Sequence, residues 1–378
     1  MDNFQKYKLK ENPFDIFTHE HKMANRQKDW DNITSSLRAA FDGTAPRYFV
    51  LLGDYGFGKS FMFEQIYMWL SKSHNRQVFT SRVYFEKRIP IQESEPRWSK
   101  FGLDIVMRIF DNIEREKLIE LLKNVKLSSF KSKYTKLFEA LKENKEVAFM
   151  YVIGGKLLKK DLDELGVQSP ITDSHTSLML FFEFLRLLNL TGYSSFLLLL
   201  DEFEFIATLG DKKITQILQT FRQIFDDFGS YVSKYKGEIA KPICMFATSP
   251  GGWDKLKELE ANARKKTGGA GIAPFMERVS PKDIIRLAAF SEEHSIELVK
   301  LRLSEKRTTS VNDPLFPFTK EAVRYVHGLS FNKPRNIIQY CGILVEDALE
   351  LGLDKIDENN AKKILDKYGI FSTSSNPK

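Results

Sequence analysis

The sequence predicts an α/β fold in which a parallel sheet forms the core, a helical insertion interrupts it, and a small all-helical domain follows. Unbroken apolar runs at 48–52 and 196–200 lack the alternation of half-exposed strands, so they are typical of strands buried on both faces of a parallel sheet. From about residue 290 the apolar residues instead recur at the 3.6-residue period of amphipathic helices.

The order of elements along the chain is consistent with this fold. The expected strands lie at 47–53, 77–86, 193–205, 241–253 and near 279–291. A helix is expected at about 25–41, and a second at 60–73 directly after a glycine-rich loop. The mostly helical stretch at 87–190 is far longer than a crossover needs, so we interpret it as the insertion. The predicted division is a core at 1–289, a helical domain at 290–372 and a disordered tail at 373–378.

Composition limits the class of protein. The 378 residues include 57 Lys and Arg against 50 Asp and Glu, and this net charge of +7 suits a polyanionic partner without requiring one. The two cysteines, Cys244 and Cys341, lie in apolar segments, which excludes a disulfide framework and a cysteine metal cluster. The N-terminal segment lacks a secretory signal, and apolar runs such as 196–200 are too short to span a membrane. We therefore expect a cytoplasmic protein without membrane contact.

The glycine-rich loop, GDYGFGKS at 53–60, matches the pattern G-x-x-x-x-G-K-[ST] in full. Glycines let successive backbone N–H groups surround phosphates at the positive end of the following helix. Lys59 is expected to reach the β- and γ-phosphates, and Ser60 to ligate Mg²⁺. The sequence therefore predicts an ATP site whose loop residues are Gly53, Asp54, Tyr55, Gly56, Phe57, Gly58, Lys59, Ser60 and Phe61.

Two carboxylates follow the third expected strand, in LLLLDE. Asp201 and Glu202 should lie at the carboxyl edge of the sheet, beside the phosphate loop. Asp201 would hold the Mg²⁺ shell, and Glu202 would polarise the attacking water as a general base. A merely solvated strand end is the alternative interpretation.

Two further polar positions are candidates for contact with the γ-phosphate. Thr248 and Ser249 end the next strand, where a hydroxyl could orient water, although an ordinary strand-ending turn has the same pattern. Arg335 follows Pro334 at the start of an expected helix, and its guanidinium could couple that domain to the nucleotide state. A surface arginine at a helix start is the alternative.

Taken in order, GDYGFGKS, LLLLDE, FATS and KPRN resemble the motifs of AAA+ ATPases. The resemblance implies Thr248 as sensor 1, Arg335 as sensor 2 and the helical domain as the lid. It also implies that the NPFD segment, with Pro13 and Phe14, lies beside the adenine.

A narrower resemblance covers nearly all of the chain. The segments LGV and PITD at 165–173, the GY turn before the third strand, ATSPGGW and PRNIIQY are similar to BREX-type ATP-binding proteins of the BrxD-like family. That group is related to origin-recognition and helicase-loader ATPases. The region at 99–151 matches nothing in it, so a partner specific to the insertion remains open.

The AAA+ resemblance also implies a homo-oligomer in which an arginine of one subunit completes the site of its neighbour. Arg278, in PFMERVSP, matches the usual position best, and Arg264 is the rival.

Lysine-rich stretches suggest contact with nucleic acid. Non-specific contact with DNA phosphates is predicted for Lys123, Lys126, Lys131, Lys133 and Lys136, and for Arg264, Lys265 and Lys266. The first group alternates with apolar residues, so it also fits the solvated face of a helix. Zinc-finger and recognition-helix patterns are absent from the sequence, which disfavours sequence-specific binding.

These observations predict an ATP hydrolase that remodels or loads a partner, such as a helicase or another DNA-processing protein, on DNA, in a BREX-like phage defence system. The alternative is a slow nucleotide-dependent switch or scaffold that acts by ATP-gated protein binding. A small-molecule kinase is disfavoured because the helical domain resembles a lid with a sensor arginine.

Overall fold

The computed structural model describes residues 3–15, 22–72, 77–84, 105–208, 211–266 and 275–371. The chain divides into two compact units, which we call the sheet unit and the loop–lid unit. The sheet unit consists of Thr34–Leu52 and Gln65–Ile285, and the loop–lid unit of Met1–Ile33, Gly53–Glu64 and Arg286–Lys378. The phosphate loop is thus grouped with the C-terminal helices, whereas the predicted division at 289/290 assigned it to the core.

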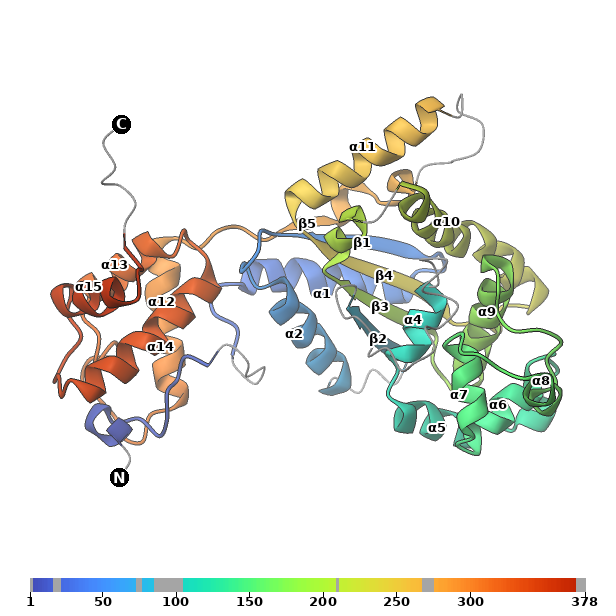
Figure 1. The fold of residues 1–378 in the computed structure, drawn as a ribbon, viewed down its shortest axis with the longest axis horizontal. Helices are drawn as coiled ribbons and strands as arrows, with labels where there is room; N and C mark the ends of the chain where they lie inside the picture. Colours follow the sequence, from blue (N-terminus) through green and yellow to red (C-terminus); the bar gives the residue numbers. More distant parts are fainter. Residues whose placement is uncertain are drawn as a thin grey trace. The chain divides into compact units, whose positions relative to one another are not determined.

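The sheet has five strands in the order β2-β3-β4-β1-β5 (Figure 1). Its strands are β1 (Arg47–Leu52), β2 (Val78–Tyr84), β3 (Ser195–Asp201), β4 (Lys241–Thr248) and the short β5 (Ile284–Arg286). Strands β2, β3, β4 and β1 pair in parallel. Every residue of β3 is buried, as are residues 48–52 of β1, which confirms the expectation drawn from the apolar runs in these two strands. Every residue of β4 is buried as well.

Aromatic side chains attach two long helices to this sheet. Phe184 of α9 (Ser174–Leu190) packs edge-on against Phe196 of β3, and Phe221 of α10 (Asp211–Lys234) packs edge-on against Phe246 of β4. Helix α11 (Pro250–Lys266) follows β4 after Ser249. The four phenylalanine rings belong to the larger hydrophobic core.

The described part of the insertion, from 105 to 190, is helical. It consists of α4 (Ile105–Asp111), α5 (Arg115–Lys123), a turn of 3-10 helix at Leu127–Ser129, α6 (Thr135–Lys142), α7 (Glu146–Val152), α8 (Lys159–Leu165) and α9. The apolar residues of these helices belong to the same core as the sheet. The insertion therefore belongs to the sheet unit and has no core of its own. Residues 87–104 of the predicted insertion lie outside the described residues.

The C-terminal helices have a separate core in the loop–lid unit. They are α12 (Glu292–Glu305), α13 (Lys320–Leu329), α14 (Pro334–Glu350) and α15 (Glu358–Lys367) (Figure 1). The N-terminal segment joins this core: Tyr7, in the 3-10 helix Asn3–Tyr7, donates a 2.8 Å hydrogen bond to the carbonyl of Leu353. The sequence did not predict that contact. The predicted tail at 373–378 lies outside the described residues.

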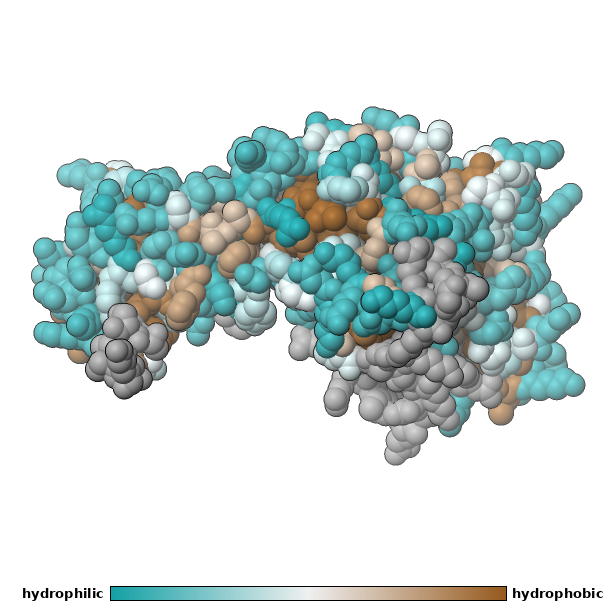
Figure 2. All heavy atoms as spheres, turned by 90° about the horizontal axis from the view of Figure 1, so that it is seen from above, coloured by the Kyte–Doolittle hydropathy of each residue, from teal (hydrophilic) through white to brown (hydrophobic). Residues whose placement is uncertain are grey.

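Two connecting helices contain residues of both units. Helix α1 (Gln27–Asp42) and helix α2 (Lys59–Lys72) each cross a boundary between them. Hydrophilic side chains predominate on the face drawn in Figure 2, as expected when the apolar residues are collected in two cores. None of the described helices is long and apolar enough to cross a bilayer.

Candidate nucleotide-binding site

The phosphate loop connects β1 to α2, as the sequence predicted. Gly56 and Gly58 have φ angles of +84° and +91°, a conformation that side-chain-bearing residues rarely adopt. Helix α2 begins at Lys59, so the loop leads directly into a helix N-terminus. Backbone N–H groups there lack partners within the helix and attract anions, as a phosphate-binding loop requires.

Three donors hold the carbonyl groups of this loop. The Lys59 Nζ donates to the carbonyl of Gly53 at 2.7 Å. The Arg26 Nη2 donates to the carbonyl of Phe57 at 3.1 Å, and the backbone N–H of Arg335 donates to the carbonyl of Gly56 at 3.3 Å. All of these residues belong to the loop–lid unit, so three hydrogen bonds within this unit hold the loop backbone.

Arg26 is a site residue that the sequence analysis missed. It is buried, forms a 3.1 Å ion pair with Asp29, and lies 4.9 Å from the centre of the Phe290 ring. Burial lowers the pKa of its guanidinium, while Asp29 acts in the opposite direction. The only signal in the sequence was an arginine just before an expected helix, and that pattern alone does not indicate a contact with the loop.

The two carboxylates lie at the end of β3 in the sheet unit, Asp201 as its last residue and Glu202 directly after it. The side chain of Asp201 is 1% exposed, and its Oδ1 accepts a 3.0 Å hydrogen bond from the N–H of Glu202. Because the strands are parallel, β3 ends at the same edge of the sheet as β1 and β4, whose last residues, Leu52 and Thr248, are paired in register. Gly53, the first residue of the phosphate loop, follows Leu52 directly.

Asp201 also accepts a 2.6 Å hydrogen bond at Oδ2 from the Nη2 of Arg82 on β2. Arg82 lies two residues before Tyr84, which is the register partner of Asp201. The sequence analysis did not single out Arg82, although a charged residue inside the strand VFTSRVY was a possible signal. Its partner depends on the pairing of β2 with β3, which the sequence does not encode locally.

Glu202 has a positive φ angle of +55°. This left-handed conformation costs a residue with a side chain about 1–2 kcal/mol, and such strain is concentrated at functional sites. The conformation is therefore consistent with a general base held in one orientation, and the catalytic role itself remains a prediction.

The hydroxyl groups that follow β4 differ in their environment. Ser249 caps α11, because its Oγ accepts a 3.1 Å hydrogen bond from the N–H of Gly252. Thr248 is fully buried at the strand end, where its hydroxyl lies 3.4 Å from the carbonyl of Ser249. Ser249 thus has a structural role, and Thr248 remains the candidate for sensor 1.

Arg335 lies against the phosphate loop within the loop–lid unit. Its Nη1 donates a 2.7 Å hydrogen bond to the hydroxyl of Tyr55, and its guanidinium carbon lies 5.1 Å from the centre of the Tyr55 ring. The predicted sensor arginine and the predicted loop therefore lie together. Contact of Arg335 with the γ-phosphate remains a prediction.

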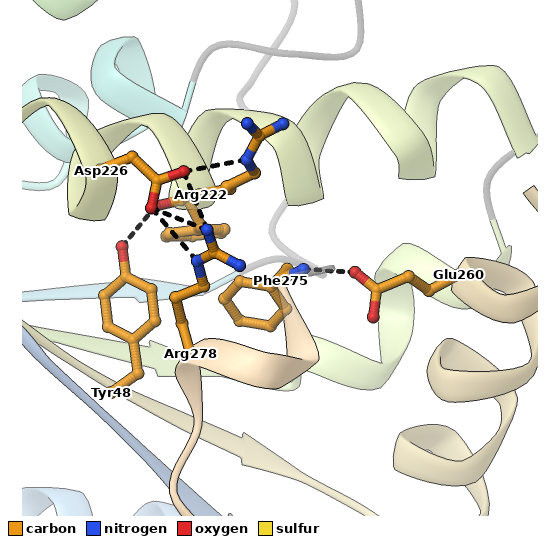
Figure 3. A network of polar contacts seen from close by, with 7 residues as sticks. Tyr48, Arg222, Asp226, Glu260, Phe275 and Arg278 are labelled. Atoms are coloured by element: carbon orange, nitrogen blue, oxygen red, sulfur yellow. Dashed lines mark hydrogen bonds and ion pairs between the residues drawn. The ribbon is translucent and has the colours of Figure 1, made fainter. Parts of the chain in front are cut away.

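Arg278 forms a local ion pair. Its Nη2 and Nε donate to Asp226 on α10 at 3.0 and 3.1 Å, and Arg222 donates to the same carboxylate at 2.9 Å (Figure 3). Figure 3 also shows Glu260 accepting a hydrogen bond from the N–H of Phe275 beside this group. For the rival Arg264, which lies in α11, the side chain is outside the described residues. An action of Arg278 in a neighbouring subunit would require it to leave Asp226.

The predicted adenine-side segment lies in the core of the loop–lid unit. Pro13 is buried, and Phe14 is 4% exposed and packs edge-on against Phe318 at 5.8 Å between ring centres. Phe14 thus has a packing role that the sequence analysis did not foresee. Its predicted place beside the base remains untested, and so little exposed surface leaves its ring few further contacts.

The donor set suits Mg²⁺ only in combination with a nucleotide. Among the described residues, no group of three or more His, Cys, Asp or Glu side chains could hold a metal ion. The Ser60 hydroxyl and the Asp201 carboxylate are hard oxygen donors, and Mg²⁺ usually binds through one or two such groups, phosphates and water.

Sequence comparisons match only a small part of this chain to a known protein. No protein-family model matches the chain. An uncharacterized HTH-type transcriptional regulator of Methanocaldococcus jannaschii is 32% identical over 97 residues, which are 26% of this chain and 23% of that protein. The match therefore spans about a quarter of the relative.

Two solved structures cover almost the whole chain. The Aeropyrum pernix ORC2 protein, in a structure with ADPNP and ADP, has a TM-score of 0.54 at 11% identity and is covered over 72% of its length by 95% of this chain. Cdc6p of Pyrobaculum aerophilum has a TM-score of 0.52 at 11% identity, and the match covers 98% of this chain and 75% of Cdc6p. At these identities the likeness shows the fold alone: the chain shares the fold of ORC2 and Cdc6p, an α/β sheet followed by a C-terminal helical domain.

Proposed function

We propose that this chain is an AAA+ ATPase that binds ATP with Mg²⁺ and hydrolyses it to ADP and phosphate. The observation that carries the proposal is the complete phosphate loop, with two glycines at positive φ, on a strand that ends at the same sheet edge as Asp201. The AAA+ fold is a second, independent support.

Each residue has a role that its chemistry suits. Lys59 binds the β- and γ-phosphates, and the N–H groups at the start of α2 complete the cradle. Ser60 and Asp201 hold the metal, which neutralises phosphate charge when it is bound. Glu202 accepts a proton from the attacking water, and Thr248 orients that water.

The proposal predicts distinct effects for two substitutions. Lys59→Ala should abolish nucleotide binding, measured with a fluorescent ATP analogue. Glu202→Gln should keep binding and lower the turnover number about 100-fold or more, since a positioned general base contributes on the order of 10²–10⁴. Glu204→Gln, two residues further along, is the matched control and should hydrolyse ATP at the wild-type rate. Equal turnover in the two glutamine variants would overturn the role of Glu202.

We propose that the ATPase binds single-stranded or duplex DNA without sequence preference and couples ATP turnover to this binding. Its support is a group of side chains that we call the basic–aromatic surface: Lys131, Lys133, Arg186, Tyr231, Lys234 and Tyr235. All belong to the sheet unit. Lys131 and Lys133 precede α9 in the sequence, and Tyr231, Lys234 and Tyr235 follow it.

Contacts within the basic–aromatic surface connect its elements. The Arg186 guanidinium lies between the rings of Phe130 and Tyr235, at 4.7 and 4.9 Å, and donates to the carbonyl of Lys131. The Lys234 Nζ lies 4.9 Å from the centre of the Tyr235 ring. Exposed lysines beside half-buried rings suit phosphates and stacked bases.

A salt titration tests this surface. We expect Lys131→Ala, Lys133→Ala and Lys234→Ala combined to weaken binding of a labelled oligonucleotide. The slope of log K against log salt should fall by about 0.7 for each lost contact with single-stranded DNA and by about 0.9 with duplex DNA. Lys355, Lys362 and Lys363, exposed in the loop–lid unit, provide a triple-alanine control. Equal losses in both triple variants would overturn the assignment of the surface.

We further propose that the ATPase acts as a homo-oligomer that remodels or loads a helicase or other DNA-processing protein, in a BREX-like defence system. The support for this is the resemblance of the motifs between residues 154 and 253 and of PRNIIQY. In this proposal Arg278 acts on the nucleotide of a neighbouring subunit. Stimulation of ATP turnover by DNA is expected, and a rate raised only by a protein partner would contradict the loading step.

A slow switch is the second candidate, and the ion pair between Arg82 and Asp201 favours it. A guanidinium on the carboxylate that should hold the metal opposes metal binding, and therefore slows turnover. Single-turnover and steady-state rates measured with and without DNA separate the two: the switch predicts slow hydrolysis under both conditions.

A further inference from the structure

We propose that the hydroxyl of Tyr55 is a specificity-determining group: it holds the Arg335 guanidinium in competition with the terminal phosphate, and so sets how strongly the protein prefers ATP to ADP. The inference rests on the proposed nucleotide binding. It concerns a side chain of the phosphate loop for which the loop motif requires no particular residue type.

The ring of Tyr55 makes two contacts with one guanidinium. The 2.7 Å hydrogen bond from the Nη1 of Arg335 reaches its hydroxyl, and the 5.1 Å separation to the ring centre is within the range of a cation–π contact. Tyr55 is 67% exposed, so it does not belong to either hydrophobic core. Its described contacts are therefore those of a partner for Arg335 and not those of a packing residue.

The backbone beneath this pair is tightly fixed. Arg335 is the second residue of α14, and its N–H donates to the carbonyl of Gly56, next to Tyr55. A Cβ on Gly56 would lie 3.3 Å from the Cβ of Arg335 and 3.6 Å from that of Lys333. The start of α14 and the loop are thus in close contact, and side-chain torsions alone can move the guanidinium relative to the loop.

The turn that precedes α14 is fixed as well. The Asn336 side chain donates to the carbonyl of Ser330 at 3.1 Å, and the N–H of Lys333 donates to the same carbonyl. Pro334 occupies the first helical position, where its ring restricts the backbone. Arg335 is therefore presented at a constant place, and its exposed head group is the part that changes partner.

The competition follows from charge. Among the described residues, Tyr55 is the only partner of the Arg335 guanidinium, and the phenol is a neutral acceptor. A γ-phosphate offers charged oxygens, and charge-assisted hydrogen bonds are about twice as strong as neutral ones. Arg335 should therefore exchange Tyr55 for ATP, whereas ADP lacks the group that would draw it away. The phenol thus reduces the extra binding free energy that the γ-phosphate gives ATP over ADP.

The test is the ratio of affinities for a non-hydrolysable ATP analogue and for ADP, measured by calorimetry with Mg²⁺. Tyr55→Phe removes the hydroxyl and keeps the ring. It should raise the affinity for the ATP analogue about two- to fivefold, the factor expected for one exposed neutral acceptor, and leave that for ADP unchanged. Tyr340→Phe, on the same helix, is the matched control and should leave both affinities unchanged.

The same substitution made in an Arg335→Ala protein tests whether the hydroxyl acts through Arg335. In Arg335→Ala protein, Tyr55→Phe should no longer alter the ratio, because the group that the hydroxyl holds is absent. A change that persists in this background would overturn the inference, as would an unchanged ratio in Tyr55→Phe alone. In the latter case wild-type protein would still bind both nucleotides, and the proposed function would stand. Failure of wild-type protein to bind either nucleotide would remove both.

Discussion

Arg82 and Asp201 form a buried ion pair at the carboxyl edge of the sheet, with 2.6 Å between Nη2 and Oδ2 and side-chain exposures of 11% and 1%. Asp201 is the carboxylate that the nucleotide site would use for its metal. The neighbouring strand β2 thus places the Arg82 guanidinium on the same carboxylate. In the proposed site, a metal ion would therefore compete with this ion pair for the Asp201 carboxylate.

Removal of Arg82 should make the protein less stable and more responsive to metal. Arg82→Ala leaves a buried carboxylate without its cation, which typically costs about 3–5 kcal/mol of unfolding free energy. Urea denaturation measures this loss. Mg²⁺ with ATP should restore more stability in the variant than in the wild type.

The double variant Arg82→Ala, Asp201→Ala is the control for that prediction. Because both charges are then absent, its loss of stability should be smaller than the sum of the two single losses. Additive losses would show that the two side chains do not stabilise each other.

Gly56→Ala should disrupt the contact between the loop and α14. Both Gly56 and Gly58 have positive φ, so alanine at either position carries the same backbone strain of about 1–2 kcal/mol. At Gly56 the new Cβ would in addition lie 3.3 Å from the Cβ of Arg335, whereas no atom lies within 4 Å at Gly58. Thermal unfolding should therefore show a greater loss for Gly56→Ala. Equal losses would mean that the approach of α14 is not a constraint on the loop.

Two adjacent glycines at the start of α11 should respond oppositely to alanine. A Cβ at Gly252 would lie 2.5 Å from the Cβ of Glu204 and 3.0 Å from the hydroxyl of Thr248, so Gly252→Ala should cost about 1–3 kcal/mol. At Gly251 no atom lies within 4 Å, and Gly251→Ala should be neutral or stabilising by up to ~1 kcal/mol. Chemical denaturation of both variants is the measurement. A stable Gly252→Ala protein would contradict the close packing beside Thr248.

The two cysteines should be unreactive until the protein unfolds. Burial raises the pKa of both Cys244 and Cys341 thiols, so less reactive thiolate is present at any given pH. At pH 8 we expect slow modification by an alkylating agent in the native state and rapid modification of both in denaturant, followed by mass spectrometry. Rapid native labelling of either thiol would show that its segment opens readily.

Arg278→Ala should affect ATP turnover more than stability if the proposed role in trans is correct. The ion pair with Asp226 is partly exposed, at 21% and 31%, and such pairs contribute at most about 1 kcal/mol. An arginine that completes a neighbouring site contributes on the order of 10³–10⁵ to the hydrolysis rate. Arg222→Ala, which removes the other arginine on Asp226, is the control and should retain activity. Equal rates in the two variants would assign Arg278 a purely structural role.

The sequence predicts the parts of this fold that depend on local pattern. The buried strands β1 and β3 were recognisable from their apolar runs at 48–52 and 196–200, and the phosphate loop was recognisable because its glycines are required by backbone conformation. The residues that follow a strand or open a helix, such as Asp201 and Arg335, could be placed from the same patterns.

Contacts between distant segments could not be predicted in this way. The partner of Arg82 depends on which strand lies beside β2, and that of Arg26 depends on a loop 31 positions further along the chain. The packing of Phe14 against Phe318 was likewise not predicted, because Phe318 lies about 300 positions further along the chain. In each case the missing information was the three-dimensional neighbour and not the chemistry of the residue.

The N-terminal segment and the C-terminal helices complete one hydrophobic core, through Tyr7, Leu9 and Phe14. A fragment that began after residue 15 would uncover Phe316, Phe318 and part of α14, and would tend to aggregate. A separately expressed helical domain must therefore keep residues 3–15 together with the helices from α12 to α15.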